Sequence, residues 1–236
     1  MLVGLAAGVL AFPVAYVLGE PPVQAAIDFE AAHAAGPAEP EVVRRGTQRT
    51  IGLLNGLAVM GVALGGLFAL AFAWAYGRVG PYGARLTAAV LALGAYLTIV
   101  VVPFTKYPAT PPATGPPETI GSRTALFVAM ISISMIAVVA ASRVRRELLP
   151  RLGSWNAAIA AAASFVALIA VAQLVLPAAN ETPAGFPPDV MWEFRLASLA
   201  IGATLWATIG LGFGAVAERL LATGTEARVA GVPASA

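Results

Sequence analysis

His33 is the only histidine in the chain, and Glu30 lies three residues before it. On a helix, side chains three positions apart share one face, so an imidazole and a carboxylate would point the same way. This pair of donors suits a divalent transition metal. A single Glu-x-x-His in a polar loop is also common as solvated surface. The residue types therefore leave a metal site and a solvated pair as alternatives.

Three further carboxylates lie in polar segments and could complete such a metal site. They are Glu20, Glu118 and Glu181. Because whole apolar segments separate them in the sequence, a shared site requires the polar loops to converge in space. The chain has no cysteine, which excludes thiolate metal sites and disulfide bonds. Any metal site must use oxygen, nitrogen or thioether ligands.

Three arginines stand at the polar ends of apolar segments: Arg49, Arg123 and Arg195. A helix N-terminus carries partial positive charge and disfavours a nearby cation, so each guanidinium needs an anion. That anion could be a lipid phosphate reached by the long side chain. It could also be a carboxylate of the same loops, and such an ion pair would shape or gate their opening. The sequence leaves both alternatives open.

The apolar sequence around these residues indicates a lipid environment. Of 236 residues, 59% are hydrophobic and 11% are charged, whereas about a quarter are charged in soluble domains. A hydrocarbon layer of about 30 Å needs about 20 apolar residues in a helix. Six segments without Asp, Glu, Lys, Arg or His approach that length; they are 1–18, 50–76, 86–102, 124–141, 155–176 and 196–216.

These segments predict an all-α integral membrane protein, a polytopic bundle of about six transmembrane helices arranged as three hairpins. Residues 1–219 would form the membrane domain and residues 220–236 a disordered cytoplasmic tail. The first segment lacks the basic start of a signal peptide, so we expect it to be retained as a helix. After it, residues 23–35 predict a short helix on the membrane surface.

The distribution of basic residues predicts the orientation, because arginine and lysine favour cytoplasmic loops. Three polar segments hold eight arginines against three carboxylates: 77–85, 142–154 and 217–236. The other three hold six basic and nine acidic residues: 19–49, 103–123 and 177–195. We therefore expect both termini in the cytoplasm. Thirteen arginines against one lysine, with abundant alanine, suggest a GC-rich bacterial genome and hence a multi-pass protein of the bacterial plasma (inner) membrane.

Glycines four residues apart recur within the apolar segments and predict close helix packing. The pairs are Gly4 and Gly8, Gly52 and Gly56, Gly61 and Gly65, and Gly210 and Gly214. Such pairs let helix backbones approach each other. We expect them to pack helices within one bundle, with homodimerisation as the alternative.

The sequence also argues against several classes of function. No carboxylate or histidine lies within the apolar segments to bind a driving proton. No nucleotide-binding loop, zinc-protease helix or nucleophile elbow is present, so we do not expect an enzyme. No basic aromatic surface indicates nucleic acid as a partner. The lipid bilayer is the partner that the composition itself requires.

Motifs in the polar loops resemble one known family. They are Gly19-Glu20-Pro21-Pro22, Glu30-Ala31-Ala32-His33, Pro103-Phe104, Lys106-Tyr107-Pro108, Pro117-Glu118-Thr119-Ile120, Asn180-Glu181 and Trp192-Glu193-Phe194-Arg195-Leu196. The chain resembles the CbtA family of probable cobalt transporter subunits, from Leu2 to about Arg219. The motifs lie in the loops and not in generic apolar sequence.

The resemblance implies a membrane subunit for cobalt uptake that supplies cobalamin synthesis, working with a small companion membrane protein, CbtB, that carries a histidine-rich motif. Co²⁺ would be the transported ion, and no cofactor would be bound permanently. The family is usually described with five spans, one fewer than the six segments here. The alternatives are a non-conducting membrane scaffold that stabilises a partner metal-transport subunit, and a lipid-modifying enzyme, for which no catalytic spacing is present.

Overall fold

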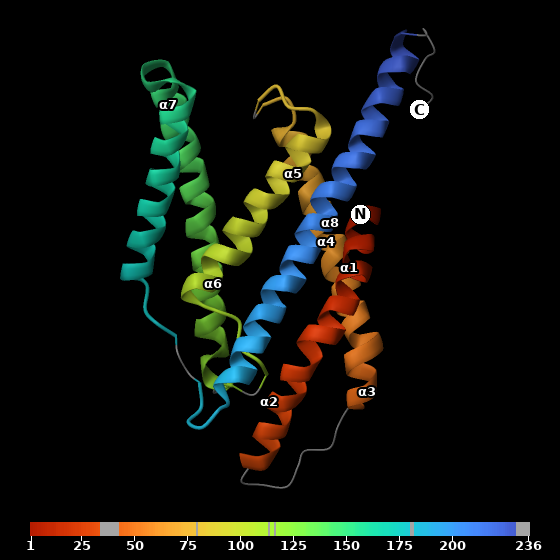
Figure 1. Cartoon of the computed structure of the whole chain (residues 1–236), viewed down its shortest axis with the longest axis vertical. Coiled ribbons are helices and arrows are strands. Elements are labelled where there is room, and N and C mark those ends of the chain that lie inside the picture. Colours follow the sequence, from red (N-terminus) through yellow and green to blue (C-terminus); the bar gives the residue numbers. More distant parts are fainter. Residues whose placement is uncertain (34–42, 79, 113, 116, 180–181, 230–236) are drawn as a thin grey trace. The chain divides into compact units, whose positions relative to one another are not determined.

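The computed structural model describes residues 1–33, 43–78, 80–112, 114–115, 117–179 and 182–229 (Figure 1). Every regular element among these residues is a helix. The helices belong to two compact units. Unit 1 comprises Met1–Pro21, Ala38–Tyr96 and Ala197–Ala236, and unit 2 comprises Pro22–Pro37 and Leu97–Leu196.

Five helical stretches are long and apolar enough to cross a membrane. They are Leu2–His33, Arg45–Ala75, Ala84–Lys106, Ile120–Val175 and Pro188–Thr223. The prediction of an all-helical protein with membrane-capable helices is therefore confirmed for the described residues. The count of six spans and the cytoplasmic position of both termini stay predictions.

The fourth stretch, α7 (Ile120–Val175), contains two of the six predicted segments. A straight helix of its 56 residues would be ~84 Å long, far more than the ~30 Å of hydrocarbon. Gly153 interrupts it with φ 73° and ψ 171°, a conformation that glycine adopts because it has no Cβ. Figure 1 shows α7 as two arms joined by a tight reversal of the chain. The segments 124–141 and 155–176 thus form the two arms of a helical hairpin.

The first stretch joins two elements that the sequence predicted as separate. The α-helix α1 (Leu2–Val14) passes through the π-helix η1 (Ala15–Gly19) into α2 (Glu20–His33). The predicted break between a span ending at residue 18 and a surface helix at 23–35 is therefore wrong. At the π turn the Glu20 amide donates to the Ala15 carbonyl, five residues back. This wider turn loosens the hydrogen-bond ladder just before Pro21 and Pro22, which supply no N–H, so the helix continues through both.

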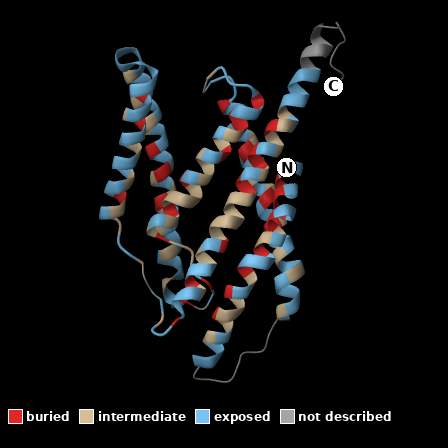
Figure 2. Cartoon of the chain, in the orientation of Figure 1, coloured by how far each residue is buried: buried red, intermediate tan, exposed pale blue. Residues whose placement is uncertain are grey.

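The second stretch consists of α3 (Arg45–Thr47), the π-helix η2 (Gln48–Gly52) and α4 (Leu53–Ala75). It packs against α1 through glycine. A Cβ on Gly4 would lie 3.0 Å from the Gly65 Cα, and closer still to the Gly61 carbonyl. A Cβ on Gly8 would lie 2.9 Å from the Ala58 Cα. Figure 2 shows buried residues on both helices where they meet. Two of the predicted glycine pairs therefore pack helices together.

A third glycine pair joins α8 (Pro188–Val229) to α5 (Ala84–Ala95) within unit 1. A Cβ on Gly210 would lie 2.5 Å from the Ala92 Cβ, and one on Gly214 would lie 3.0 Å from the Arg85 Cα. Only glycine permits this approach of the two backbones. The prediction of close packing at this pair is confirmed.

The fourth pair, Gly52 and Gly56, does not serve this purpose among the described residues. A Cβ on Gly56 would meet nothing within 4 Å, and one on Gly52 would meet only the Thr47 carbonyl of its own helix, at 3.4 Å. Both glycines are exposed. This face of α4 is therefore left uncovered by the part of the chain that the structure describes.

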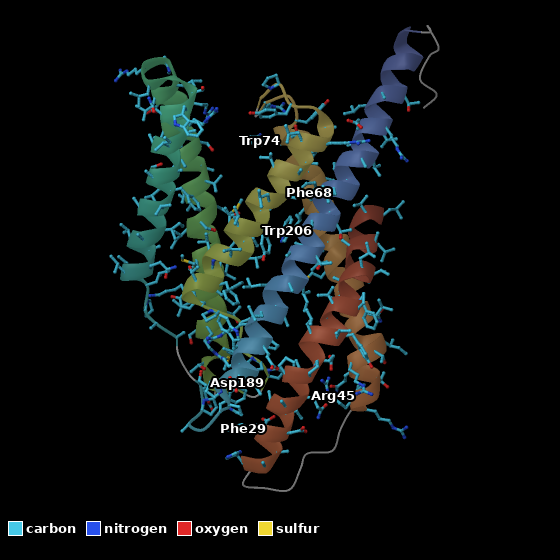
Figure 3. The ribbon with its side chains drawn as sticks, viewed as in Figure 1. Phe29, Arg45, Phe68, Trp74, Asp189 and Trp206 are labelled. Atoms are coloured by element: carbon cyan, nitrogen blue, oxygen red, sulfur yellow. The ribbon has the colours of Figure 1, made fainter. Side chains whose placement is uncertain are left out.

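An aromatic cluster fills unit 1 between α4 and α8. The Phe68 ring lies 6.4 Å from Trp206 and 5.3 Å from Phe213, both edge-on, and Phe72 lies 5.0 Å from Phe213. Figure 3 labels Phe68 and Trp206 on these two helices. Edge-to-face aromatic pairs add to the burial of apolar area. They supplement the glycine contacts that hold unit 1 together.

The C-terminal helix extends into the segment that the sequence assigned to a disordered tail. α8 ends at Val229, ten residues beyond the predicted boundary at residue 219. Residues 230–236 lie outside the described part of the chain. The division into a membrane domain, 1–219, and a disordered tail, 220–236, stays a prediction.

Candidate functional site

The imidazole of His33 is oriented by a backbone carbonyl. Its Nδ1 lies 2.8 Å from the carbonyl oxygen of Phe29, one helical turn earlier in α2. A carbonyl oxygen can only accept a hydrogen bond, so Nδ1 donates and carries the proton. In the neutral imidazole the lone pair is then on Nε2, the arrangement found in metal-binding histidines. Glu30 is on the same helix, and both side chains are exposed.

The Phe29 ring packs against one face of this imidazole. The two rings stack with centroids 4.2 Å apart, and Phe29 packs edge-on against Phe186 at 5.1 Å. Phe186 belongs to a buried cluster with Ala26 and Met191. Figure 3 labels Phe29 on this part of α2. The only histidine of the chain is thus held by packed aromatic rings, although it is itself exposed.

Glu20 forms an ion pair with an arginine that the sequence did not single out. Its Oε2 accepts a hydrogen bond from Arg45 Nη2 at 2.5 Å, and the side chains are 15% and 21% exposed, respectively. Arg49, one of the three arginines for which the sequence left a carboxylate or a lipid phosphate as the anion, is exposed. The helix begins at Arg45, five residues before the predicted start, and this places Arg45 opposite Glu20. No pattern in the sequence identified Arg45 as this partner, because the pairing depends on the register of α1 against α4.

The five predicted metal ligands are distributed over both units. Glu20 belongs to unit 1, whereas Glu30, His33 and Glu118 belong to unit 2; Glu118 is exposed in the 3₁₀ helix η4 (Pro117–Thr119). Glu181 lies outside the described residues. Among the residues that are described, no group of three or more His, Asp or Glu side chains could hold a metal ion. The five-residue site stays a prediction.

Two of the predicted arginines have partly buried side chains in unit 2. Arg123, in the first turn of α7, lies so close to the backbone of residue 115 that a Cβ on Gly115 would be 2.5 Å from its Nη1. The Nε atoms of Arg123 and Arg195 are both buried. The inner parts of both guanidinium groups are therefore packed against protein. A gating role for Arg49, Arg123 and Arg195 stays a prediction.

Comparison with protein families identifies the chain. A family model described as a probable cobalt transporter subunit, CbtA, matches residues 1–218 of the 236. The chain belongs to the CbtA family. The resemblance inferred from the loop motifs is thereby confirmed. A membrane location and a part in cobalt transport follow from the family and the five membrane-capable helices. Searches of curated proteins and of solved structures found no match.

In this CbtA-family chain, a polar network that the sequence did not predict joins the end of α6 (Val102–Lys106) to α7. Lys106 Nζ donates to the Gln173 carbonyl at 2.6 Å, and Gln173 Nε2 donates to Thr105 Oγ1 at 2.6 Å. The ammonium group thus caps the C-terminal end of α7, where a cation is favoured by the helix dipole. Two features of the sequence could have indicated this network: Lys106 is the only lysine of the chain, and Gln173 is a rare amide within an apolar segment.

Tyr107 extends this network beyond the end of α6. Its hydroxyl donates to the Pro177 carbonyl at 2.8 Å, and the side chain packs against Met130 and Ala172 in a buried cluster of unit 2. Burial raises the pKa of the Tyr107 hydroxyl above its usual value of 10.0. The phenol therefore stays protonated, and remains a hydrogen-bond donor, over the physiological pH range.

A second polar contact of unit 2 lies within the apolar segments, beside the π-helix η3 (Tyr96–Val101). Pro103 supplies no N–H to the carbonyls one turn earlier. The hydroxyl of Ser134 donates to one of them, that of Thr98, at 2.5 Å. Ser134 is fully buried. In this family member the side chain from α7 thus supports the π turn in its neighbour.

Proposed function

We propose that this chain is the membrane subunit of a divalent metal uptake system that imports Co²⁺ to supply cobalamin synthesis. It would act in the bacterial plasma membrane beside a small CbtB-like companion subunit. The family match over residues 1–218 carries this proposal. The five membrane-capable helices support it, because a subunit that passes an ion must span the bilayer.

The outer polar loops would capture the metal first. His33 offers Nε2 toward solvent, and Glu30 offers a carboxylate from the same helix. Imidazole and carboxylate are both ligands that Co²⁺ accepts, and Ni²⁺ has similar preferences. Two protein ligands leave most of the coordination positions to water or to further groups, which suits capture and release better than storage. Glu20, Glu118 and Glu181 would be the further carboxylates.

The driving energy would come from another chain. The predicted apolar segments contain no Asp, Glu, Lys, Arg or His, and proton-coupled carriers usually place such residues in the membrane. The two buried polar residues described in the apolar segments of unit 2 both have partners, because the Ser134 hydroxyl donates to the Thr98 carbonyl and the Thr98 hydroxyl donates to Met135 Sδ. Coupling by a partner subunit is consistent with a family of transporter subunits.

The test is Co²⁺ uptake into proteoliposomes that contain the purified chain, with and without its companion, against Ni²⁺, Mg²⁺ and empty vesicles. We expect Co²⁺ to enter vesicles that contain the chain and its companion faster than it enters empty vesicles. Glu118→Gln and Glu181→Gln should each lower the initial rate several-fold. Asp189→Asn, which alters another exposed carboxylate of unit 2, is the matched control. Unchanged uptake in both glutamate variants would contradict the site assignment.

A non-conducting scaffold for a metal-transport subunit is the second candidate. The face of η2 and α4 around Gly52 and Gly56, which no described helix covers, favours it, because small residues at this spacing let another helix approach closely. Under this alternative the companion subunit would co-purify with the chain, and no Co²⁺ would enter proteoliposomes containing both. Uptake by the chain alone would exclude it.

A further inference from the structure

The ion pair between Glu20 and Arg45 occupies the end of the α1–α4 helix pair in unit 1. The carboxylate and guanidinium groups are joined at 2.5 Å, and both side chains are largely withdrawn from solvent. Figure 3 labels Arg45 beside α2 and α3. A charge-assisted hydrogen bond of this kind is about twice as strong as one between neutral groups. One Glu20 oxygen is therefore already engaged.

The helix register places these two residues opposite each other. Gly8 packs against Leu57 where the helices cross. Twelve residues separate Gly8 from Glu20, and twelve separate Arg45 from Leu57, so two antiparallel helices bring the charges together at the same level. Each interval contains one π turn, η1 on one side and η2 on the other. Because each π turn adds one residue, the two insertions cancel. The ion pair is therefore set by the packing of the helices.

The pair also lies near the polar boundary of the first apolar segment. From Leu2 to Glu20 the helix rises ~27 Å, close to the ~30 Å thickness of the hydrocarbon layer. Charges at such a boundary attract each other more strongly than they do in bulk water, because the effective dielectric constant is lower. A cation that uses Glu20 as a ligand must therefore displace Arg45 or share the carboxylate with it.

We infer that Arg45 is a specificity-determining residue, which competes with cations for Glu20 and lets divalent ions through in preference to monovalent ones. A monovalent ion carries the same charge as the guanidinium group, so replacing Arg45 by this ion at Glu20 brings no gain in Coulomb attraction to the carboxylate. A divalent ion has twice the Coulomb attraction for the carboxylate at equal distance. The inference rests on the proposed function in taking Glu20 as a metal ligand, and it adds a reason for excluding Na⁺ and K⁺.

The test measures Co²⁺ binding to the purified full chain by calorimetry, at low and at high NaCl concentration. Arg45→Gln should bind Co²⁺ about tenfold more tightly than wild type, equivalent to ~1.4 kcal/mol, and NaCl should now weaken this binding. Arg44→Gln, which removes the neighbouring exposed arginine, should behave as wild type. Equal Co²⁺ affinity in wild type and Arg45→Gln, or no binding in either, would overturn the inference.

Two further variants keep the inference testable if Arg45→Gln does not fold. Arg45→Lys keeps the charge but lacks the planar fork that fits a carboxylate, so it should show a smaller increase in Co²⁺ affinity in the same direction. Glu20→Gln should bind Co²⁺ more weakly, and adding Arg45→Lys to it should cause no further change. An Arg45→Lys affinity equal to that of wild type would count against the competition.

Binding and uptake separate this inference from the proposed function. If Arg45→Gln tightens Co²⁺ binding while no Co²⁺ enters wild-type proteoliposomes with or without the companion, the competition for Glu20 stands and transport by this chain is wrong. If wild type transports Co²⁺ and its affinity does not depend on Arg45, transport stands and the competition is wrong.

Discussion

Hydrogen bonds of single residues distinguish the predicted metal ligands from one another. The Phe29 carbonyl fixes the proton of His33 on Nδ1, so that in the neutral imidazole the lone pair is on Nε2. Arg45 forms an ion pair with Glu20. Glu20 and Glu30, which look equivalent in the sequence, therefore differ in how available their carboxylates are to a ligand. Glu30 is exposed on the same helix as His33, whereas a cation at Glu20 would compete with the arginine.

At the same scale, Ser134 provides a test of the buried contact with η3. Ser134→Ala should lower the free energy of unfolding by ~1–3 kcal/mol, because a buried carbonyl loses its donor. Ser132→Ala is the matched control, since this exposed hydroxyl donates to Val128 in its own helix. Thermal unfolding in detergent measures both variants. A loss for Ser134→Ala no larger than that for Ser132→Ala would refute the supporting role.

Among the elements, the α1–α4 pair shows how glycine spacing becomes packing. Gly4 and Gly8 lie against the Gly61 and Leu57 carbonyls, and the same spacing at Gly52 and Gly56 contacts no other described helix. Four-residue spacing alone does not say which pairs are used. The partner helix decides, because a close approach requires small residues at matching levels on both sides.

Replacement of these glycines tests this difference. Gly8→Leu should destabilise the protein by ~1–3 kcal/mol or more, because the side chain would overlap the α4 backbone. Gly56→Leu should change stability by only ~0.5 kcal/mol, since it points into open space within the described chain. Thermal unfolding of the purified chain in detergent checks both. Equal effects would show that α1 and α4 do not meet at Gly8.

On the scale of the whole molecule, topology in the membrane is the main open prediction. The native chain has no cysteine, so single cysteines can be labelled without background. A membrane-impermeant maleimide should label Ala31→Cys in intact cells, because α2 ends in a predicted outer loop. Ser154→Cys, beside the turn of the α7 hairpin, should react only after permeabilisation. Labelling of both in intact cells would contradict the predicted orientation.

The sequence determined the class of this protein because the bilayer imposes a simple rule. Every backbone polar group in lipid must be satisfied within its own segment, so long apolar runs such as 50–76 and 196–216 had to be helices. The loop motifs likewise indicated the family. The sequence also pointed to three of the glycine pairs that pack helices, since close approach requires small residues.

Only the tertiary structure decided what depends on how helices meet. It joined residues 1–18 to the segment beyond Pro22 through a π turn, although proline is usually taken as a break. It paired Glu20 with Arg45 and not with Arg49, because the register of two antiparallel helices sets which charges face each other. The spacing of residues within one segment does not say which residues of a neighbouring helix lie opposite them. The glycine contacts between α1 and α4 fix this register.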